Sequence, residues 1–220
     1  MSVTKTRTDA SLSAACWSCG AAVSGGHFCP SCGKIQPLPA GTDYFGVFGF
    51  PRKLRVNLGE LEQRFHQLSW KLHPDNFMRA SEFERNLSLE RSSELNDAYR
   101  ALQDPVARVE YLLARGGVRK EGAAKQQAPP ELLEEVFELN ESLDELKEAR
   151  ESGGEIGQLR ERLLAAQKNF QEKLNEVDAE LENAFGGWDR AVESSAGEAA
   201  ERELMAQMNE VLNRRSYIRN

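Results

Sequence analysis

Apolar residues recur along most of the chain in steps of three and four positions, which is the spacing of one helix face. The clearest run places five apolar residues on one face of an expected helix: Leu58, Leu61, Phe65, Leu68 and Leu72. Asn57 followed by Glu60 forms the start signal of a capping box for this helix. Pro74 disfavours helical backbone at the residue before it, so the helix should end near His73.

Shorter signals predict three further helices around this one. Asp43 can cap a short helix that carries Tyr44 and Phe48. A later helix has four residues on one face: Leu95, Ala98, Tyr99 and Leu102. Asp104 followed by Pro105 is a cap with proline at the first helical position, which opens a fourth helix.

The second half of the chain predicts three longer helices. The first carries a stripe of five apolar residues, which we expect to face inward: Leu132, Val136, Leu139, Leu143 and Leu146. Gly153-Gly154 ends it, a second helix runs on from Ile156, and a third carries Met208. Antiparallel helices with single apolar stripes form a bundle. We therefore expect an all-α protein, with short hairpins only around the cysteines.

Proline, glycine and small polar residues mark two soft boundaries, one at residues 34–42 and one at residues 116–130. They predict a disordered N-terminus, a cysteine module, a four-helix domain, a linker and a helical bundle, over residues 1–15, 16–36, 43–118, 119–130 and 131–220.

Charge is distributed unevenly over the 220 residues, whose formal net charge is −7. Residues 120–220 carry thirteen Lys and Arg against twenty-three Asp and Glu. An acidic second half disfavours nucleic acid as a ligand, because phosphate contacts need clustered cations. No apolar run approaches the roughly 18 residues that a membrane span needs. The first fifteen residues also lack a secretory signal, so we expect a cytoplasmic protein, or a mitochondrial-matrix protein in a eukaryotic source.

Four cysteines form two C-x-x-C pairs that nine residues separate: Cys16, Cys19, Cys29 and Cys32. Two such pairs can complete a tetrahedron around one ion, and Gly20 and Gly33 suit the tight turn after each pair. Disulfides and an iron–sulfur centre are the alternatives. The spacing favours one structural zinc ion per chain in a small zinc-ribbon-like knob, and we expect His27 to be a turn residue rather than a ligand.

The tripeptide His73-Pro74-Asp75 falls between two helices that must pack together. It should form an exposed loop made rigid by proline and suited to docking. Arg64 and Lys71 lie opposite the apolar stripe of the preceding helix, where a solvated face is the simplest interpretation.

Residues 43–113 resemble a J-domain, and five phrases resemble the HscB family in particular: residues 43–45, 72–75, 94–99, 102–105 and 110–113. In that family the J-domain precedes a helical domain that binds an iron–sulfur scaffold, and some members carry a four-cysteine N-terminal knob. The resemblance implies that His73, Pro74 and Asp75 trigger ATP hydrolysis in an HscA/DnaK-type chaperone. Arg64 and Lys71 would then belong to the face that meets the chaperone's acidic lobe. Asn76 stands where the family commonly has lysine.

Leu133 and Phe137 lie on the flank of the first bundle helix, among glutamates. They either widen the core or form an exposed docking patch. The resemblance matches five residues to the surface that grips an IscU-type scaffold: Leu133, Phe137, Glu138, Glu141 and Tyr217. Glu134 and Asn140 replace the family's methionine and arginine.

These observations favour an adaptor without catalysis of its own, which delivers the scaffold to the chaperone and stimulates its ATPase. A general J-domain chaperone with a structural zinc module is the alternative, but a Gly/Phe-rich linker is missing from the sequence. An enzyme is disfavoured because the sequence offers neither a glycine-rich phosphate loop nor a nucleophile–base pair.

Overall fold

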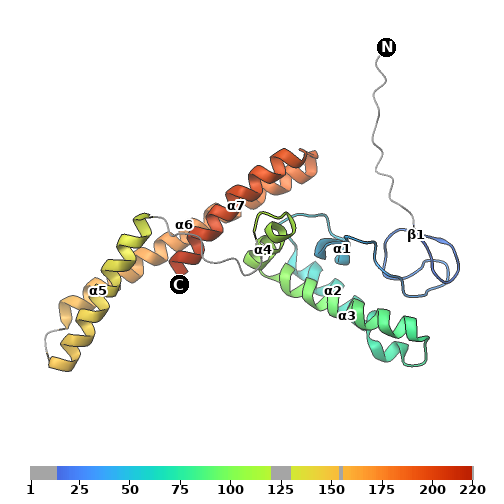
Figure 1. Ribbon diagram of the computed structural model, residues 1–220, viewed down its shortest axis with the longest axis horizontal. Coiled ribbons are helices and arrows are strands. Elements are labelled where there is room, and N and C mark those ends of the chain that lie inside the picture. The colour runs from blue at the N-terminus through green and yellow to red at the C-terminus, as the bar shows by residue number, and fades with distance from the viewer. Residues whose placement is uncertain (1–13, 120–129, 154–155, 220) are drawn as a thin grey trace, which may run out of the picture. The chain divides into compact units, whose positions relative to one another are not determined.

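The computed structural model describes residues 14–119, 130–153 and 156–219, and this part of the chain is mainly helical (Figure 1). Its elements in chain order are β1 (Ala14–Ala15), β2 (Ala22–Val23), α1 (Tyr44–Phe48), α2 (Leu58–Leu72), the short 3-10 helix η1 (Pro74–Phe77), α3 (Glu82–Gln103), α4 (Pro105–Arg115), α5 (Pro130–Ser152), α6 (Gly157–Ser194) and α7 (Glu198–Arg219). The all-α prediction is confirmed, and the two short antiparallel strands lie beside the cysteines, where hairpins were expected. None of the described helices combines the length and the apolar character that crossing a bilayer requires.

The chain forms two compact units, and each has its own core. The first comprises Met1–Arg52 and Val56–Asp104, and the second comprises Lys53–Arg55 and Pro105–Asn220. The cysteine module thus shares a unit with α1, α2 and α3, while α4 belongs to the second unit. This division differs from the predicted boundaries, which gave the cysteine module a segment of its own and placed α4 with the three helices before it.

In the first unit, α1, α2 and α3 pack around apolar residues that are almost inaccessible to water: Phe45, Leu61, Leu72, Leu95 and Leu102. Phe65 of α2 stacks on Tyr99 of α3 with ring centroids 4.1 Å apart. Leu58 is an exception to the predicted stripe, because 52% of its surface is exposed. It is the first residue of α2, and the neighbouring helices leave about half of it uncovered at this end.

The predicted helix boundaries in this unit are confirmed by their caps. The Asp43 side chain accepts a hydrogen bond from Gly46 N at the start of α1, and Asn57 accepts one from Glu60 N at the start of α2. Helix α2 ends at Leu72, one residue before the extended His73 that Pro74 requires. Helix α3 begins earlier than its apolar stripe suggested, at a full capping box between Ser81 and Glu84.

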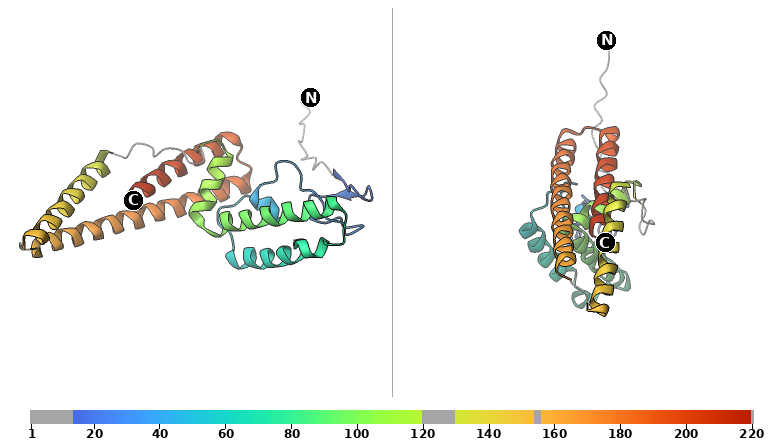
Figure 2. Two further views of the ribbon diagram at one scale, coloured as in Figure 1. Left: turned by 60° about the horizontal axis from the view of Figure 1, so that its bottom comes forward. Right: turned by 90° about the vertical axis from the view of Figure 1, so that its left-hand side faces the viewer.

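In the second unit, α5 and α7 both pack against the long helix α6 (Figure 2). Ion pairs join Glu135 of α5 to Lys173 of α6, and Arg215 of α7 to Asp178 of α6. The core contains Leu181, Phe185 and Trp188 of α6 together with apolar residues of α4 and α7. Apolar burial therefore explains why α4 belongs to this unit.

Helix α5 is less buried than its stripe predicted. Leu132 is 9% exposed, but Val136 and Leu143 are 37% and 39% exposed, so the expectation that both fill an inward seam is wrong. The described contacts of α5 are made mainly with the α6 helix, and a single partner helix covers only a narrow strip of a helix surface. Helix α5 therefore presents apolar side chains to solvent.

Candidate metal centre and docking surfaces

The four cysteines meet at one point in the first unit. Their sulfur atoms all lie within 4.8 Å of one another, and this is the one cluster of metal-binding character among the described residues. The cysteines are free rather than disulfide-bonded. His27 is outside the cluster, as predicted.

Both cysteine pairs adopt the same local geometry. Gly20 N donates to Cys16 O and Gly33 N donates to Cys29 O, each at 2.9 Å, and both glycines have positive φ angles near 70°. These left-handed turns need glycine because a side chain would be strained there. The predicted role of the two glycines is confirmed.

The sulfur spacing fits a tetrahedral ion. Cys16 Sγ lies 3.7 Å from Cys32 Sγ, and Cys19 Sγ lies 3.7 Å from Cys29 Sγ. A tetrahedral zinc ion with Zn–S bonds of about 2.3 Å holds its sulfur atoms about 3.8 Å apart. A disulfide would need about 2.05 Å. The four residues therefore suit a metal ion and not a pair of disulfides.

The protonation of these thiols reflects their crowding. Burial raises the pKa of Cys16, but the backbone N–H groups of Cys19 and Ser18 outweigh it and lower that pKa to about 6. For Cys19, the backbone at Ala21 lowers the pKa, yet the neighbouring Cys32 thiol and burial raise it to about 12. Four close sulfurs cannot all carry a negative charge without a cation among them, so a bound divalent ion would offset this repulsion.

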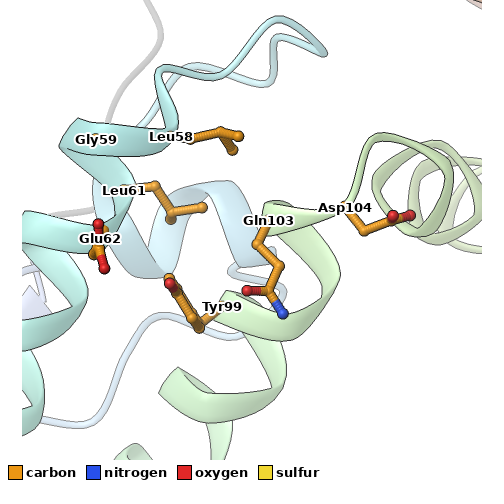
Figure 3. A pocket seen from close by; sticks show the side chains of 7 residues that line it. All are labelled: Leu58, Gly59, Leu61, Glu62, Tyr99, Gln103 and Asp104. Carbon is orange, nitrogen blue, oxygen red and sulfur yellow. The ribbon is translucent and has the colours of Figure 1, made fainter.

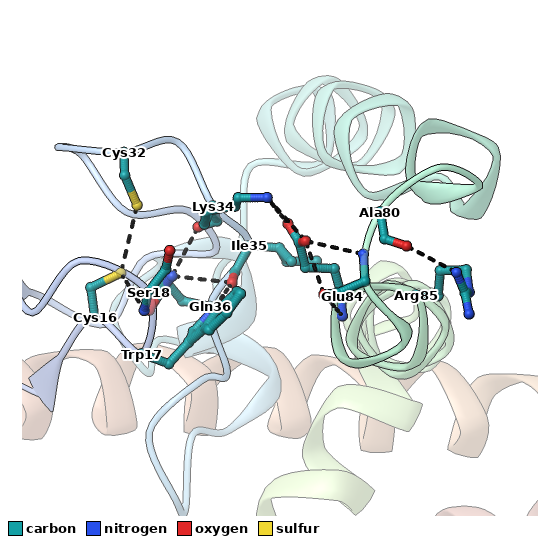
Figure 4. A network of polar contacts seen from close by, with 11 residues as sticks. Cys16, Trp17, Ser18, Cys32, Lys34, Ile35, Gln36, Ala80, Glu84 and Arg85 are labelled. Carbon is teal, nitrogen blue, oxygen red and sulfur yellow. Dashed lines mark hydrogen bonds and ion pairs between the residues drawn. The ribbon is translucent and has the colours of Figure 1, made fainter.

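The cysteine module packs directly on α3 (Figure 4). Lys34 Nζ lies 2.8 Å from one carboxylate oxygen of Glu84 and 3.0 Å from the other. Trp17 meets Phe83 edge to face at 4.9 Å and donates from Nε1 to Ile35 O at 2.7 Å. The Lys34 side chain lowers the pKa of Glu84, although burial opposes the shift.

His27 and Ile35 extend this contact. His27 Nε2 lies 2.8 Å from Val47 O at α1, and Ile35 has no exposed surface. Burial lowers the pKa of His27, so its ring is neutral at pH 7 and donates to that carbonyl. The module and the helices after it form one packed body.

The tripeptide forms the exposed turn between α2 and α3. Pro74 and Asp75 open η1, and the side chains of His73 and Asp75 are 56% and 78% exposed. Asp75 N donates to His73 Nδ1 at 3.3 Å, and the Asp75 carboxylate lies 3.5 Å from the same nitrogen. This local contact orients the imidazole and the carboxylate toward each other in an accessible position.

Side chains from α3 and from the turn fix the end of α2. Ser88 and Ser92 of α3 both donate to Leu72 O, at 2.6 and 3.0 Å. Asn76 donates from Nδ2 to Trp70 O at 2.7 Å. These bonds satisfy carbonyls that a helix end leaves without partners, and they hold the tripeptide on a rigid base. Asn76 thus caps the C-terminal end of α2.

The two cations expected on the face of α2 opposite its apolar stripe lie in different settings. The Arg64 guanidinium donates to Phe48 O at 2.5 Å and to Glu60 at 2.6 Å, and it lies over the Phe50 ring at 4.3 Å. The hydrogen bonds from Arg64 Nη1 to the carbonyls of Phe48 and Gly49 thus join α2 to the end of α1. Lys71 is exposed in the last turn of α2.

The apolar pair expected on the flank of α5 faces solvent. Leu133 is 54% exposed and Phe137 is 63% exposed, and the glutamates around them, Glu138 and Glu141 among them, are also exposed. Tyr217 is half-buried near the end of α7. Solvent exposure of the pair is what a docking patch requires, and the core-widening alternative does not fit it.

An open hollow of about 470 Å³ lies at the other end of α2, away from the tripeptide. Leu61 of α2 and Tyr99 and Gln103 of α3 point into the space between the two helices (Figure 3). Its acidic lining groups are Glu62 and Asp104, and no nucleophile accompanies them among the residues that line it. The hollow does not have the composition of an enzyme active site.

Sequence reasoning missed Trp70. Its side chain is 80% exposed on α2, three residues before His73. A large aromatic residue that falls outside the apolar stripe was the available signal.

No protein-family model matches the chain, but individual proteins do. The iron-sulfur cluster co-chaperone protein HscB of Mus musculus is 32% identical over 169 residues, which cover 75% of this chain and 70% of the mouse protein. A co-chaperone protein HscB homolog of Vibrio vulnificus strain YJ016 is 31% identical over 142 residues, covering 64% and 81% of the two chains. The crystal structure of human co-chaperone protein HscB superposes with a TM-score of 0.57 at 26% identity and covers 94% of this chain and 97% of the human one.

Proposed function

Because the chain belongs to the HscB family of iron–sulfur cluster co-chaperones, we propose that it binds an IscU-type scaffold and delivers it to an HscA/DnaK-type ATPase chaperone. It stimulates the ATPase of that chaperone and so promotes release of the cluster from the scaffold. The chain performs no catalysis itself.

The rigid and exposed tripeptide is the observation that carries this proposal. His73 and Asp75 project from a turn whose backbone is fixed by α3 and Asn76, so they can reach a partner without being reordered. Prior ordering lowers the entropic cost of binding. Lys71 beside them adds a cation suited to an acidic partner surface.

The scaffold is bound by the patch on α5, which we define as Leu133, Phe137, Glu138 and Glu141, with Tyr217 of α7 as its further member. Large apolar side chains among carboxylates are typical of a protein-docking surface, since the apolar groups provide affinity and the charges provide specificity. The exposure of Leu133 and Phe137 supports this role.

The four cysteines would hold one structural zinc ion. That ion would crosslink the two cysteine turns and would need no open coordination position, because four thiolates are a complete ligand set for zinc. The contacts of Trp17 and Lys34 with α3 make this module a support for the J-domain.

The test is His73→Gln. The side chain is exposed, so the helical circular dichroism and the melting curve should match those of wild type, and scaffold affinity should be unchanged. Stimulation of the chaperone's steady-state ATPase should be lost. A variant that binds scaffold and still stimulates turnover at the wild-type level would refute the proposal.

A further inference from the structure

The most exposed large apolar side chain recorded in the described part of the chain is Trp70, at 80%. Successive helix residues are rotated by about 100°, so Trp70 points about 180° away from Leu61, which is fully buried in the core. An aromatic residue that is 80% exposed contributes little to packing, and a polar residue would form the helix equally well. Its surface is available to a partner.

Trp70 lines one concavity together with His73 and Asp75 of the tripeptide. His66, Ser69, Trp70, His73, Asp75 and Asn76 surround a hollow of about 460 Å³ on the outer side of α2. The backbone of Trp70 is tied to the turn, because Asn76 donates to Trp70 O. A partner protein that contacts His73 and Asp75 in this hollow therefore also contacts the indole of Trp70.

The charges around Trp70 indicate the chemistry of the partner surface. Lys71 follows it in the chain, and His66 lies one helical turn before it on the same face. Trp70 thus lies near Lys71 and two histidines, and each histidine has a carboxylate beside it: Glu62 lies 3.8 Å from His66, and Asp75 lies 3.5 Å from His73. Lys71 is therefore the cation that a partner beside the indole would meet, and an acidic surface with an apolar site is complementary to Lys71 and Trp70.

We propose that Trp70 is an apolar anchor for the ATPase chaperone, and that it inserts into an apolar seat on the acidic surface against which His73 and Asp75 dock. This inference rests on the proposed function and extends it. The tripeptide triggers hydrolysis, whereas Trp70 determines how tightly the chaperone is held. Tryptophan near the centre of an interface is a frequent hot spot.

Trp70→Ala in the full-length chain tests whether Trp70 provides affinity while the tripeptide triggers hydrolysis. Melting temperature and helical content should stay at wild-type values, since the side chain packs against little. In an ATPase titration with a DnaK-type chaperone, the half-maximal co-chaperone concentration should rise about 10- to 30-fold. Maximal stimulation should be retained, because His73 and Asp75 are intact. Trp70→Phe should recover much of the affinity.

Leu58→Ala is the matched control, because Leu58 is also apolar and exposed (52%) but lies at the opposite end of α2. It should leave the half-maximal concentration unchanged. An unchanged value for Trp70→Ala, or an equal rise for both variants, would overturn the inference. So would a wild-type dimer that Trp70→Ala converts to a monomer without change in the titration, which would assign the surface to a second copy of the chain.

His73→Gln measured in parallel separates this inference from the proposed function. If His73→Gln stimulates like wild type, the proposed function fails, and the anchor fails with it. If His73→Gln fails to stimulate the ATPase while Trp70→Ala gives the wild-type half-maximal concentration, only the assignment of Trp70 as an anchor is wrong.

Discussion

Two phenylalanines of the second unit differ mainly in exposure and give a matched test of the scaffold-binding patch. Phe137 on α5 is 63% exposed, and Phe185 on α6 is 2% exposed. Both lie within helices, so a change to alanine carries the same gain in helix propensity in both. Differences between the two variants therefore report burial.

The structure sets the size of the two effects on stability. Full burial of a phenylalanine contributes about 1.5–3 kcal/mol, and only about a third of Phe137 is covered, so Phe137→Ala should lower the free energy of unfolding by about 1 kcal/mol or less. Phe185→Ala removes a core ring and leaves a cavity, at about 3–5 kcal/mol. At about 2–4 °C per kcal/mol, the second variant should melt roughly 6–20 °C lower and the first within a few degrees of wild type.

Scaffold binding should show the opposite order. The exposed part of Phe137 becomes buried when the scaffold binds, which corresponds to about 1–2 kcal/mol, or a loss of affinity of roughly 5- to 30-fold. Phe185→Ala should retain wild-type affinity at temperatures where it remains folded. Thermal circular dichroism and a calorimetric isotherm on the same samples measure both quantities.

The patch hypothesis fails if the two results are reversed. A melting temperature of Phe137→Ala lowered as far as that of Phe185→Ala would mean that α5 packs more tightly than the structure shows. Normal melting together with wild-type scaffold affinity, in Phe137→Ala and also in Leu133→Ala, would place the scaffold elsewhere.

Three further predictions concern the cysteine module and its contact with α3. Anaerobically purified protein should contain one zinc ion per chain by elemental analysis, whereas an iron–sulfur absorption band would contradict the assignment. Metal affinity in a competition titration should fall on acidification, because thiolates must be deprotonated to bind; pH-independent affinity would exclude thiolate ligation. Lys34 holds the pKa of Glu84 in the folded protein below its ordinary value of 4.5. The ionised carboxylate therefore stabilises the folded state fully when the pH is above 4.5, and this stabilisation is lost as the pH falls through the pKa of the folded protein. The difference in unfolding free energy between wild type and Glu84→Gln should accordingly be largest near pH 7 and shrink below about pH 4.5, and a difference that does not vary with pH would refute the ion pair with Lys34.

Local signals in the sequence predicted most of the helices and the metal cluster. Asp43, Asn57 and Pro74 act on neighbouring backbone groups, so these helix boundaries could be predicted from the sequence. The start of α3 at Ser81 was not predicted, because only the apolar stripe of that helix was used. The same holds for the two cysteine pairs, since each turn is closed by its own glycine.

Contacts between distant segments could not be predicted in the same way. The apolar face of α4 does not reveal in the sequence which helices will cover it. In the structure, helices of the second unit cover this face. The spacing of Trp17 and Lys34 gives no sign that they meet Phe83 and Glu84, more than forty residues later. The sequence predicts the apolar stripe of α5, but it does not show that mainly one helix, α6, covers this stripe.

The central claim is that this one chain joins a scaffold to an ATPase chaperone, and the chaperone's ATPase rate measured with both proteins present tests it most directly. Scaffold is titrated into the chaperone with and without a fixed amount of wild-type co-chaperone. We expect the combined rate to exceed the sum of the two separate stimulations several-fold, because the tripeptide and the α5 patch act on one assembly. A combined rate equal to that sum would contradict the account, since the chain would then act on the chaperone without delivering the scaffold.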